Sequence, residues 1–214
     1  MIVAQPVLET HPSDGFGLWP VAEPEPSGFL ALDGTLTSAE VGAAVMYIAT
    51  CNDIDPDGDR PPRPADPLAS FLHGLLTFDT LFASGGLRIT DLATGVTFLP
   101  GCCDGLEDWR DWSRLVAGDG LLGFGHAPVT PLAERLGGTI RLTVDAERSG
   151  SPFIELTPSG LRDLLAGAER DLAAFRVLAD DWASANLPAH RAAVGAALSR
   201  VLDLPDLLGP SRPS

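Results

Sequence analysis

The sequence of 214 residues contains no lysine, so its 14 basic residues are all arginines. Only three cysteines are present, an odd number that includes an adjacent pair, and this excludes a disulfide-stabilised scaffold. No window approaches the ~18 apolar residues that a membrane span needs. The first residues, MIVAQPVLETHPSDG, lack the basic start and apolar run of a signal peptide. We therefore expect a soluble cytoplasmic protein without a membrane partner.

Acidic residues are the most abundant charged type, and the formal net charge is −15. Residues 1–66 hold eleven of the 29 acidic residues but only two arginines, Arg60 and Arg63. An acidic surface repels nucleic acid and anionic lipid headgroups and favours basic partners. The charge therefore predicts no nucleic-acid binding and either a basic protein partner or a role in solubility alone.

The hydrophobic pattern predicts an α+β fold, a single domain in which an antiparallel sheet with at least two hairpins packs against helices. We expect the hairpins at residues 87–99 and 139–156. Residues 118–138 are predicted to be a loop with a short helix around 131–136. The expected division is a Pro-rich arm (1–28), whose prolines favour edge strands over a central one, a domain (29–204) and a flexible tail (205–214).

Capping signals and periodicity predict several helices. Thr37 and Glu40 have the spacing of a capping box before residues 41–50, and Asp66-Pro67 marks the start of a helix that runs to about residue 82. Residues 158–186 and 188–202 form a predicted C-terminal helical hairpin. Cys51 and His73 are interpreted as buried structural residues.

Residues 99–116, LPGCCDGLEDWRDWSRLV, combine the most distinctive chemistry in the chain. Asp104 is the predicted N-cap of a helix that begins at Gly105, with Glu107 completing a capping box. Trp109 and Trp112 are predicted to face the core. The charged residues are expected to pair as Glu107–Arg110 and Asp111–Arg114. The candidate binding residues on this acidic segment are Asp104, Glu107, Asp108 and Asp111.

Cys102 and Cys103 precede this helix, where a helix dipole lowers the pKa of a thiol. With His126 as a base, they are candidate catalytic residues of a thiol enzyme or of a redox switch. The same three residues are an incomplete zinc set, because a fourth ligand is not evident. The favoured interpretation is a pair of buried thiols at a corner of the fold.

Four aspartates follow the first helix at alternate positions, in the order of the front half of an EF-hand calcium loop. The twelfth position, which should be an acidic ligand, is Pro64. We therefore favour a solvated acidic loop and expect no cofactor, with weak calcium binding as the alternative. The candidate ligands are Asp53, Asp55, Asp57 and Asp59.

Two resemblances carry no activity to this chain. The DGTLT of residues 33–37 resembles the end of the haloacid-dehalogenase phosphatase motif, but the nucleophilic aspartate of that motif is replaced by Ala31, which excludes the reaction. Residues 71–181, with PGCCDGLEDW, GFGH and TIRLTVD, resemble a group of proteins from GC-rich actinobacteria that implies no function.

The predicted function is that of a non-enzymatic acidic protein-binding module. Small acidic α+β proteins without a catalytic set are similar in kind to immunity proteins that neutralise basic toxins, an analogy of class only. The alternative is a thiol-dependent enzyme or redox-sensitive protein that uses Cys102 or Cys103 with His126.

Overall fold

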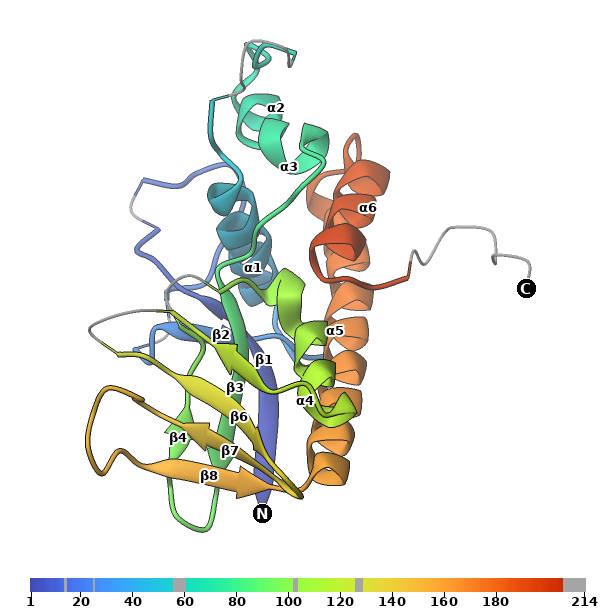
Figure 1. Ribbon diagram of the computed structural model, residues 1–214. Coiled ribbons are helices and arrows are strands. Elements are labelled where there is room, and N and C mark those ends of the chain that lie inside the picture. Colours follow the sequence, from blue (N-terminus) through green and yellow to red (C-terminus); the bar gives the residue numbers. More distant parts are fainter. Residues whose placement is uncertain (14, 25, 56–60, 102–103, 126–128, 206–214) are drawn as a thin grey trace.

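The computed structural model describes residues 1–13, 15–24, 26–55, 61–101, 104–125 and 129–205 (Figure 1). Within these ranges the chain forms two four-stranded antiparallel sheets and six α-helices, which confirms the predicted α+β class. Figure 1 shows the second sheet crossing in front of the lower part of the first, with α4 and α5 along one side. No helix in the described ranges is long and apolar enough to cross a membrane.

The first sheet has the strand order β2-β1-β3-β4, so β1 is an interior strand. The prediction of an edge strand for the first residues is therefore wrong. Pro6 is tolerated because its carbonyl, on the β2 side, accepts the Leu32 amide at 2.8 Å, just past the end of β2. The N–H that proline lacks faces the same side, so the ladder with β3 loses no donor. The strands are β1 (Ile2–Glu9), β2 (Phe29–Ala31), β3 (Gly85–Asp91) and β4 (Thr97–Phe98).

One face of this sheet belongs to the core. Leu8 lies opposite Leu30 and Ile89 lies opposite Phe98, so the register places large apolar side chains side by side. All four are nearly or fully buried. Burial of this kind stabilises the fold by roughly 1.5–3 kcal/mol for each large side chain.

The second sheet is a meander in the order β5-β6-β7-β8, which corrects the prediction for residues 118–138. Residues 131–136 form no helix, because Gly137-Gly138 is a two-residue turn that pairs β6 with β7. Gly137 has φ +62°, a conformation that glycine adopts without strain. The predicted hairpin that begins at residue 139 is confirmed as β7 and β8. The strands are β5 (Leu121–Gly123), β6 (Leu132–Leu136), β7 (Thr139–Thr143) and β8 (Phe153–Leu156).

The first helices follow their capping signals in part. The capping box of Thr37 and Glu40 is present at the start of α1 (Ser38–Cys51), and Asp66 caps α2 (Pro67–Phe71). The single helix predicted for residues 67–82 is instead divided into α2 and α3 (His73–Thr77).

A contact with Asn52, the residue after α1, explains why the helix predicted for residues 67–82 ends early. The Asn52 side chain donates to the carbonyl of Phe82 at 2.8 Å and accepts from the amide of the same residue at 3.1 Å. This pairing fixes the segment after α3 in a non-helical path. His73 is buried, as predicted, and its Nε2 lies 2.9 Å from the carbonyl oxygen of Pro61.

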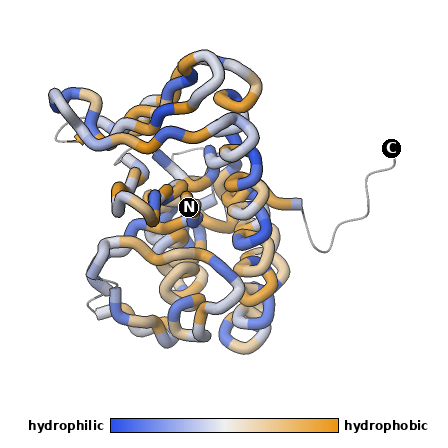
Figure 2. Tube along the Cα trace, turned by 90° about the horizontal axis from the view of Figure 1, so that it is seen from below, coloured by the Kyte–Doolittle hydropathy of each residue, from blue (hydrophilic) through white to orange (hydrophobic). Residues whose placement is uncertain are grey.

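The predicted helical hairpin is present as α5 (Pro158–Asn186) and α6 (Arg191–Val201). Figure 2 shows hydrophobic and hydrophilic residues alternating along the helices at the right of that view, the pattern of helices with one buried face. A shorter helical segment crosses between the sheets and α5. It consists of the 3₁₀ helix η1 (Leu106–Trp112) and α4 (Ser113–Ala117).

Arg176 holds the two long helices together from within the core. Its Nε donates to the Gly195 carbonyl at 3.1 Å and to the Ser199 hydroxyl at 3.2 Å. Its Nη1 forms an ion pair with Asp180 at 3.0 Å, and the two side chains are only 4% and 13% exposed. Such a pair is costly to break because the remaining charge stays buried.

We predict that Arg176→Ala lowers the free energy of unfolding by about 3–5 kcal/mol, because Asp180 is then an unpaired buried charge. Arg170→Ala removes an exposed arginine from the same helix and should change stability by no more than ~0.5 kcal/mol. Urea denaturation of both variants measures the difference. Equal, small losses for the two variants would contradict the role assigned to Arg176.

Candidate functional site

The segment η1–α4 is built on apolar residues that recur at every third position. Leu106, Trp109, Trp112 and Leu115 are at most 3% exposed. A 3₁₀ helix has three residues per turn, so η1 places the first three of these side chains on one buried face. The prediction that both tryptophans belong to the core is confirmed.

Both tryptophans are also fixed by specific contacts. The Nε1 of Trp109 donates to the carbonyl of Leu202 at 2.9 Å, which ties η1 to the end of α6. The ring of Trp112 stacks on Phe124 at 4.9 Å and meets Phe98 edge-on at 5.8 Å. Trp112 therefore contacts both sheets, because Phe98 belongs to β4 and Phe124 follows β5.

The predicted charge pairs are present only in part. Arg114 pairs with Asp111 at 3.9 Å, as expected. Arg110 instead pairs with Glu169 at 2.7 Å and with Asp203 at 2.8 Å, so the pair that was expected with Glu107 is not formed.

Asp104 does not cap the helix, contrary to the prediction. The N-cap of η1 is Gly105, which makes no side-chain capping bond. Glu107 is directed instead to the segment just before β3, where its carboxylate accepts the amide of Ala83 at 2.9 Å. With the cap position shifted by one residue, the carboxylate of Asp104 is free to turn toward a cavity beside η1.

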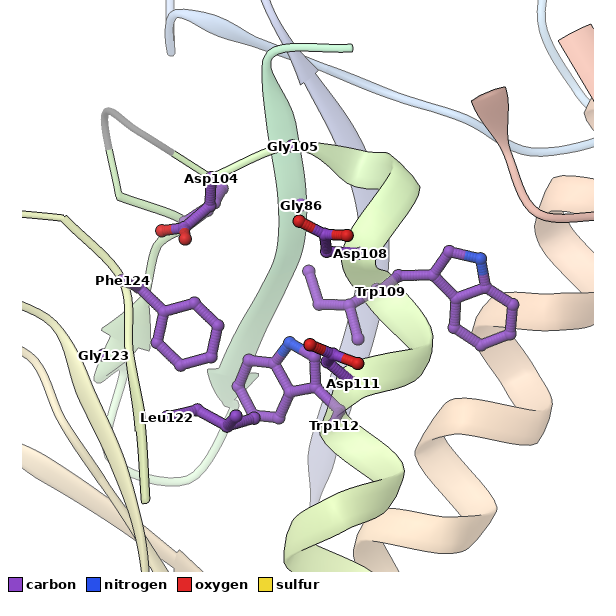
Figure 3. Close-up of a pocket in the computed structure, with 12 residues that line it drawn as sticks. Gly86, Asp104, Gly105, Asp108, Trp109, Asp111, Trp112, Leu122, Gly123 and Phe124 are labelled. Carbon is purple, nitrogen blue, oxygen red and sulfur yellow. The ribbon is translucent and has the colours of Figure 1, made fainter. Parts of the chain in front are cut away.

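This cavity has a volume of about 100 Å³ and is the candidate functional site. It is lined by Asp104, Asp108 and Asp111, together with the rings of Trp112 and Phe124. Figure 3 shows Asp104 above the ring of Phe124 on one side, and Asp108 and Asp111 on the η1 side. The cavity thus brings together three of the four predicted binding residues. Other lining residues are Gly86, Leu87, Pro100, Gly105, Trp109, Leu122 and Gly123.

The carboxylates differ in their exposure. Asp108 and Asp111 are exposed at the mouth, whereas Asp104 is partly buried. The Oδ2 atom of Asp104 is fully buried and has no hydrogen-bond partner among the described residues. Burial raises the pKa of Asp104, the amide of Gly101 acts in the opposite direction, and the charge of Asp108 raises it further.

Glu107, the fourth predicted binding residue, does not line the cavity. Burial raises the pKa of its carboxyl group, hydrogen bonds from the backbone lower it, and the charges of Asp108 and Asp104 raise it. Its role in this structure is to accept the buried amide of Ala83. We therefore assign Glu107 to stability and not to the binding surface.

The candidate thiols, their candidate base and half of the candidate calcium ligands cannot be placed relative to the cavity. Cys102, Cys103, His126, Asp57 and Asp59 are outside the described residues. The third thiol, at the end of α1, is described. Burial raises the pKa of Cys51, the backbone of Ser84 lowers it, and Glu107 and Glu9 raise it. Their net effect is a raised pKa for this partly buried thiol.

The described part of the acidic loop carries a counter-ion of its own. Arg63 bonds to Asp53 through Nη1 and to Asp55 through Nε at 3.1 Å. Among the described residues, no group of three or more His, Cys, Asp or Glu side chains is placed to hold a metal ion.

Sequence reasoning did not find the other walls of the cavity. Gly86 lies on β3, and Phe124 follows β5. These residues become neighbours of η1 only when β3, η1 and β5 come together in the folded chain. No sequence motif identifies them as parts of one site. The period of three from Leu106 to Leu115 was the one available signal for the 3₁₀ geometry that orients the acidic side chains.

No protein-family model, curated protein sequence or solved structure matches the chain. The chemistry of the site must therefore be read from its own geometry.

We predict that Asp104→Asn raises the free energy of unfolding at pH 7. Because the folded-state pKa is raised, the folded protein holds this proton more tightly than the unfolded chain. The contribution of Asp104 to stability is therefore most favourable in acid and is lost as the pH rises from the ordinary pKa through the raised one. The gain of the variant should be complete above this interval and disappear below it. Urea denaturation across the acid range tests this, and a variant that is less stable than the parent at pH 7 would contradict it.

We predict a different result at Glu107. Glu107→Ala leaves the buried amide of Ala83 without an acceptor and should cost about 1–3 kcal/mol. Glu107→Gln keeps an acceptor oxygen and removes a buried charge, so it should be neutral or stabilising. Chemical denaturation at pH 7 distinguishes the two, and similar losses in both variants would show that the charge itself is required.

Proposed function

We propose that this protein is a non-enzymatic binding module for a basic protein partner and that the cavity beside η1 lies at the centre of its binding surface. The observation that carries the proposal is the convergence of Asp104, Asp108 and Asp111 on one cavity whose lining contains no basic residue in the described part of the chain.

The charge of the whole chain supports the same interpretation. A net charge of −15 produces a field that attracts basic proteins and accelerates their association. The two exposed carboxylates, Asp108 and Asp111, stand at the mouth of the cavity, where they would meet an approaching partner first. An immunity- or inhibitor-like role, in which the module covers a basic surface of another protein, fits this arrangement.

The dimensions of the cavity also favour a protein partner. Sites for small-molecule substrates usually enclose about 300–1,000 Å³, whereas this cavity measures about 100 Å³. It accommodates the end of a side chain more readily than a whole metabolite. The alternative prediction, a thiol-dependent or redox-sensitive protein, depends on Cys102, Cys103 and His126, which lie outside the described residues.

We predict that arginine-rich and lysine-rich peptides both bind the protein at low ionic strength and that salt weakens both interactions. The double variant Asp108→Asn/Asp111→Asn should bind on the order of fivefold more weakly, the effect of two exposed ion pairs of ~0.5 kcal/mol each. Fluorescence anisotropy with labelled peptides measures both effects.

The matched control is Asp163→Asn/Asp181→Asn, which removes the same charge from exposed positions on α5. If this control weakens binding as much as the first pair, the attraction is a general effect of net charge and the cavity is not its centre. If neither peptide binds at low salt, the proposed function is wrong.

A further inference from the structure

We infer that the cavity beside η1 is a receptor for a single arginine side chain of the partner, whose guanidinium group enters between Asp104 and the wall formed by Trp112 and Phe124. This inference rests on the proposed function and adds the chemical group that the cavity recognises.

The first support is the match in size. A volume of about 100 Å³ is enough for a few water molecules. A compact planar group that displaces a few waters suits this space. An extended ligand does not.

The second support is the arrangement of the acceptors. Three carboxylates line the cavity, but they are not gathered closely enough to hold a metal ion. A guanidinium group carries five N–H donors in a fixed plane, so it can reach acceptors that are spread around it. Asp104 would accept at the inner end, and Asp108 and Asp111 would accept at the mouth, where the guanidinium group would compete with Arg114 for Asp111.

The third support is the unpartnered oxygen at the inner end. A buried acceptor without a donor costs about 1–3 kcal/mol, and native structures seldom keep one without a reason. The Oδ2 atom of Asp104 is in this condition among the described residues, and Asp104 itself lines the cavity. An entering guanidinium group would bring N–H donors and a positive charge to this carboxylate, whose cavity has no basic residue among its described lining.

The aromatic wall favours arginine over lysine. The rings of Trp112 and Phe124 are stacked at 4.9 Å and present an apolar surface beside the carboxylates. A guanidinium ion is weakly hydrated and packs well on aromatic surfaces, whereas an ammonium ion is strongly hydrated and loses more on leaving water. The cavity should therefore discriminate between two ligands of equal charge.

The test compares three peptides of one sequence in which a central residue is arginine, lysine or citrulline, the neutral isostere of arginine. Isothermal titration with the full chain at physiological salt should show arginine bound about tenfold more tightly than either other peptide. Asp104→Asn should weaken the arginine peptide by roughly 10- to 100-fold, as expected for a lost charge partner in a desolvated site. Asp119→Asn, an exposed change of equal charge outside the cavity, should have no effect.

A second readout guards against a folding defect. The arginine peptide should raise the melting temperature of the parent and of Asp119→Asn but not that of Asp104→Asn.

The possible outcomes separate the two proposals. Equal binding of the arginine and lysine peptides, each weakened by salt, would overturn the arginine receptor and leave the basic-partner function standing. Equal binding of the citrulline and arginine peptides would overturn it as well, because the carboxylates would then contribute nothing. Displacement of the arginine peptide by millimolar calcium, but not by the same ionic strength of sodium, would mark the cavity as a metal site and would also overturn the inference.

Discussion

The insertion of the buried face of η1 among two sheets and the C-terminal helices is the constraint on which the rest of the structure depends. Trp112 meets Phe98 from the first sheet and Phe124 from the second, while Trp109 donates to the carbonyl at residue 202, just after α6. These parts of the chain are far apart in sequence. Aromatic rings of this size contribute much of the energy of a core and have strict orientation. The tryptophan face therefore determines both where η1 lies and how it is rotated.

That rotation determines the site. Once Trp109 and Trp112 face inward, Asp108 and Asp111 must face outward on the neighbouring positions, beside the cavity. Glu107 is drawn to the amide of Ala83, so the turn before η1 is held without a capping aspartate. Asp104 is left partly buried, with one oxygen unpaired among the described residues and a raised pKa. Such a carboxylate beside a cavity is consistent with the proposed cation site, because a bound cation would favour its charged form.

Local signals predicted the parts of the fold that local interactions decide. The capping box of Thr37, the Asp66 cap and the periodicity of α5 were readable because each depends on neighbours within one or two turns. The interior position of β1 could not be predicted from the sequence. Pro6 costs no ladder hydrogen bond only because it lies opposite Leu32, just past the end of β2. Asp104 was misjudged for a similar reason: the bond between Glu107 and Ala83 spans 24 residues and competes with the expected capping box. The acidic residues of the site were found from the sequence, but the cavity that unites them requires the tertiary structure.

The pKa of Asp104, followed by NMR of its side-chain carboxyl carbon, tests most directly whether this carboxylate is positioned to receive a cation. In the free protein the value should lie above that of an ordinary aspartate, because burial and the charge of Asp108 both favour the protonated form. Saturation with the arginine peptide should lower it, because a neighbouring guanidinium group favours the charged form. A normal value in the free protein, or a raised value that the peptide leaves unchanged, would contradict the assignment of this cavity as the binding site.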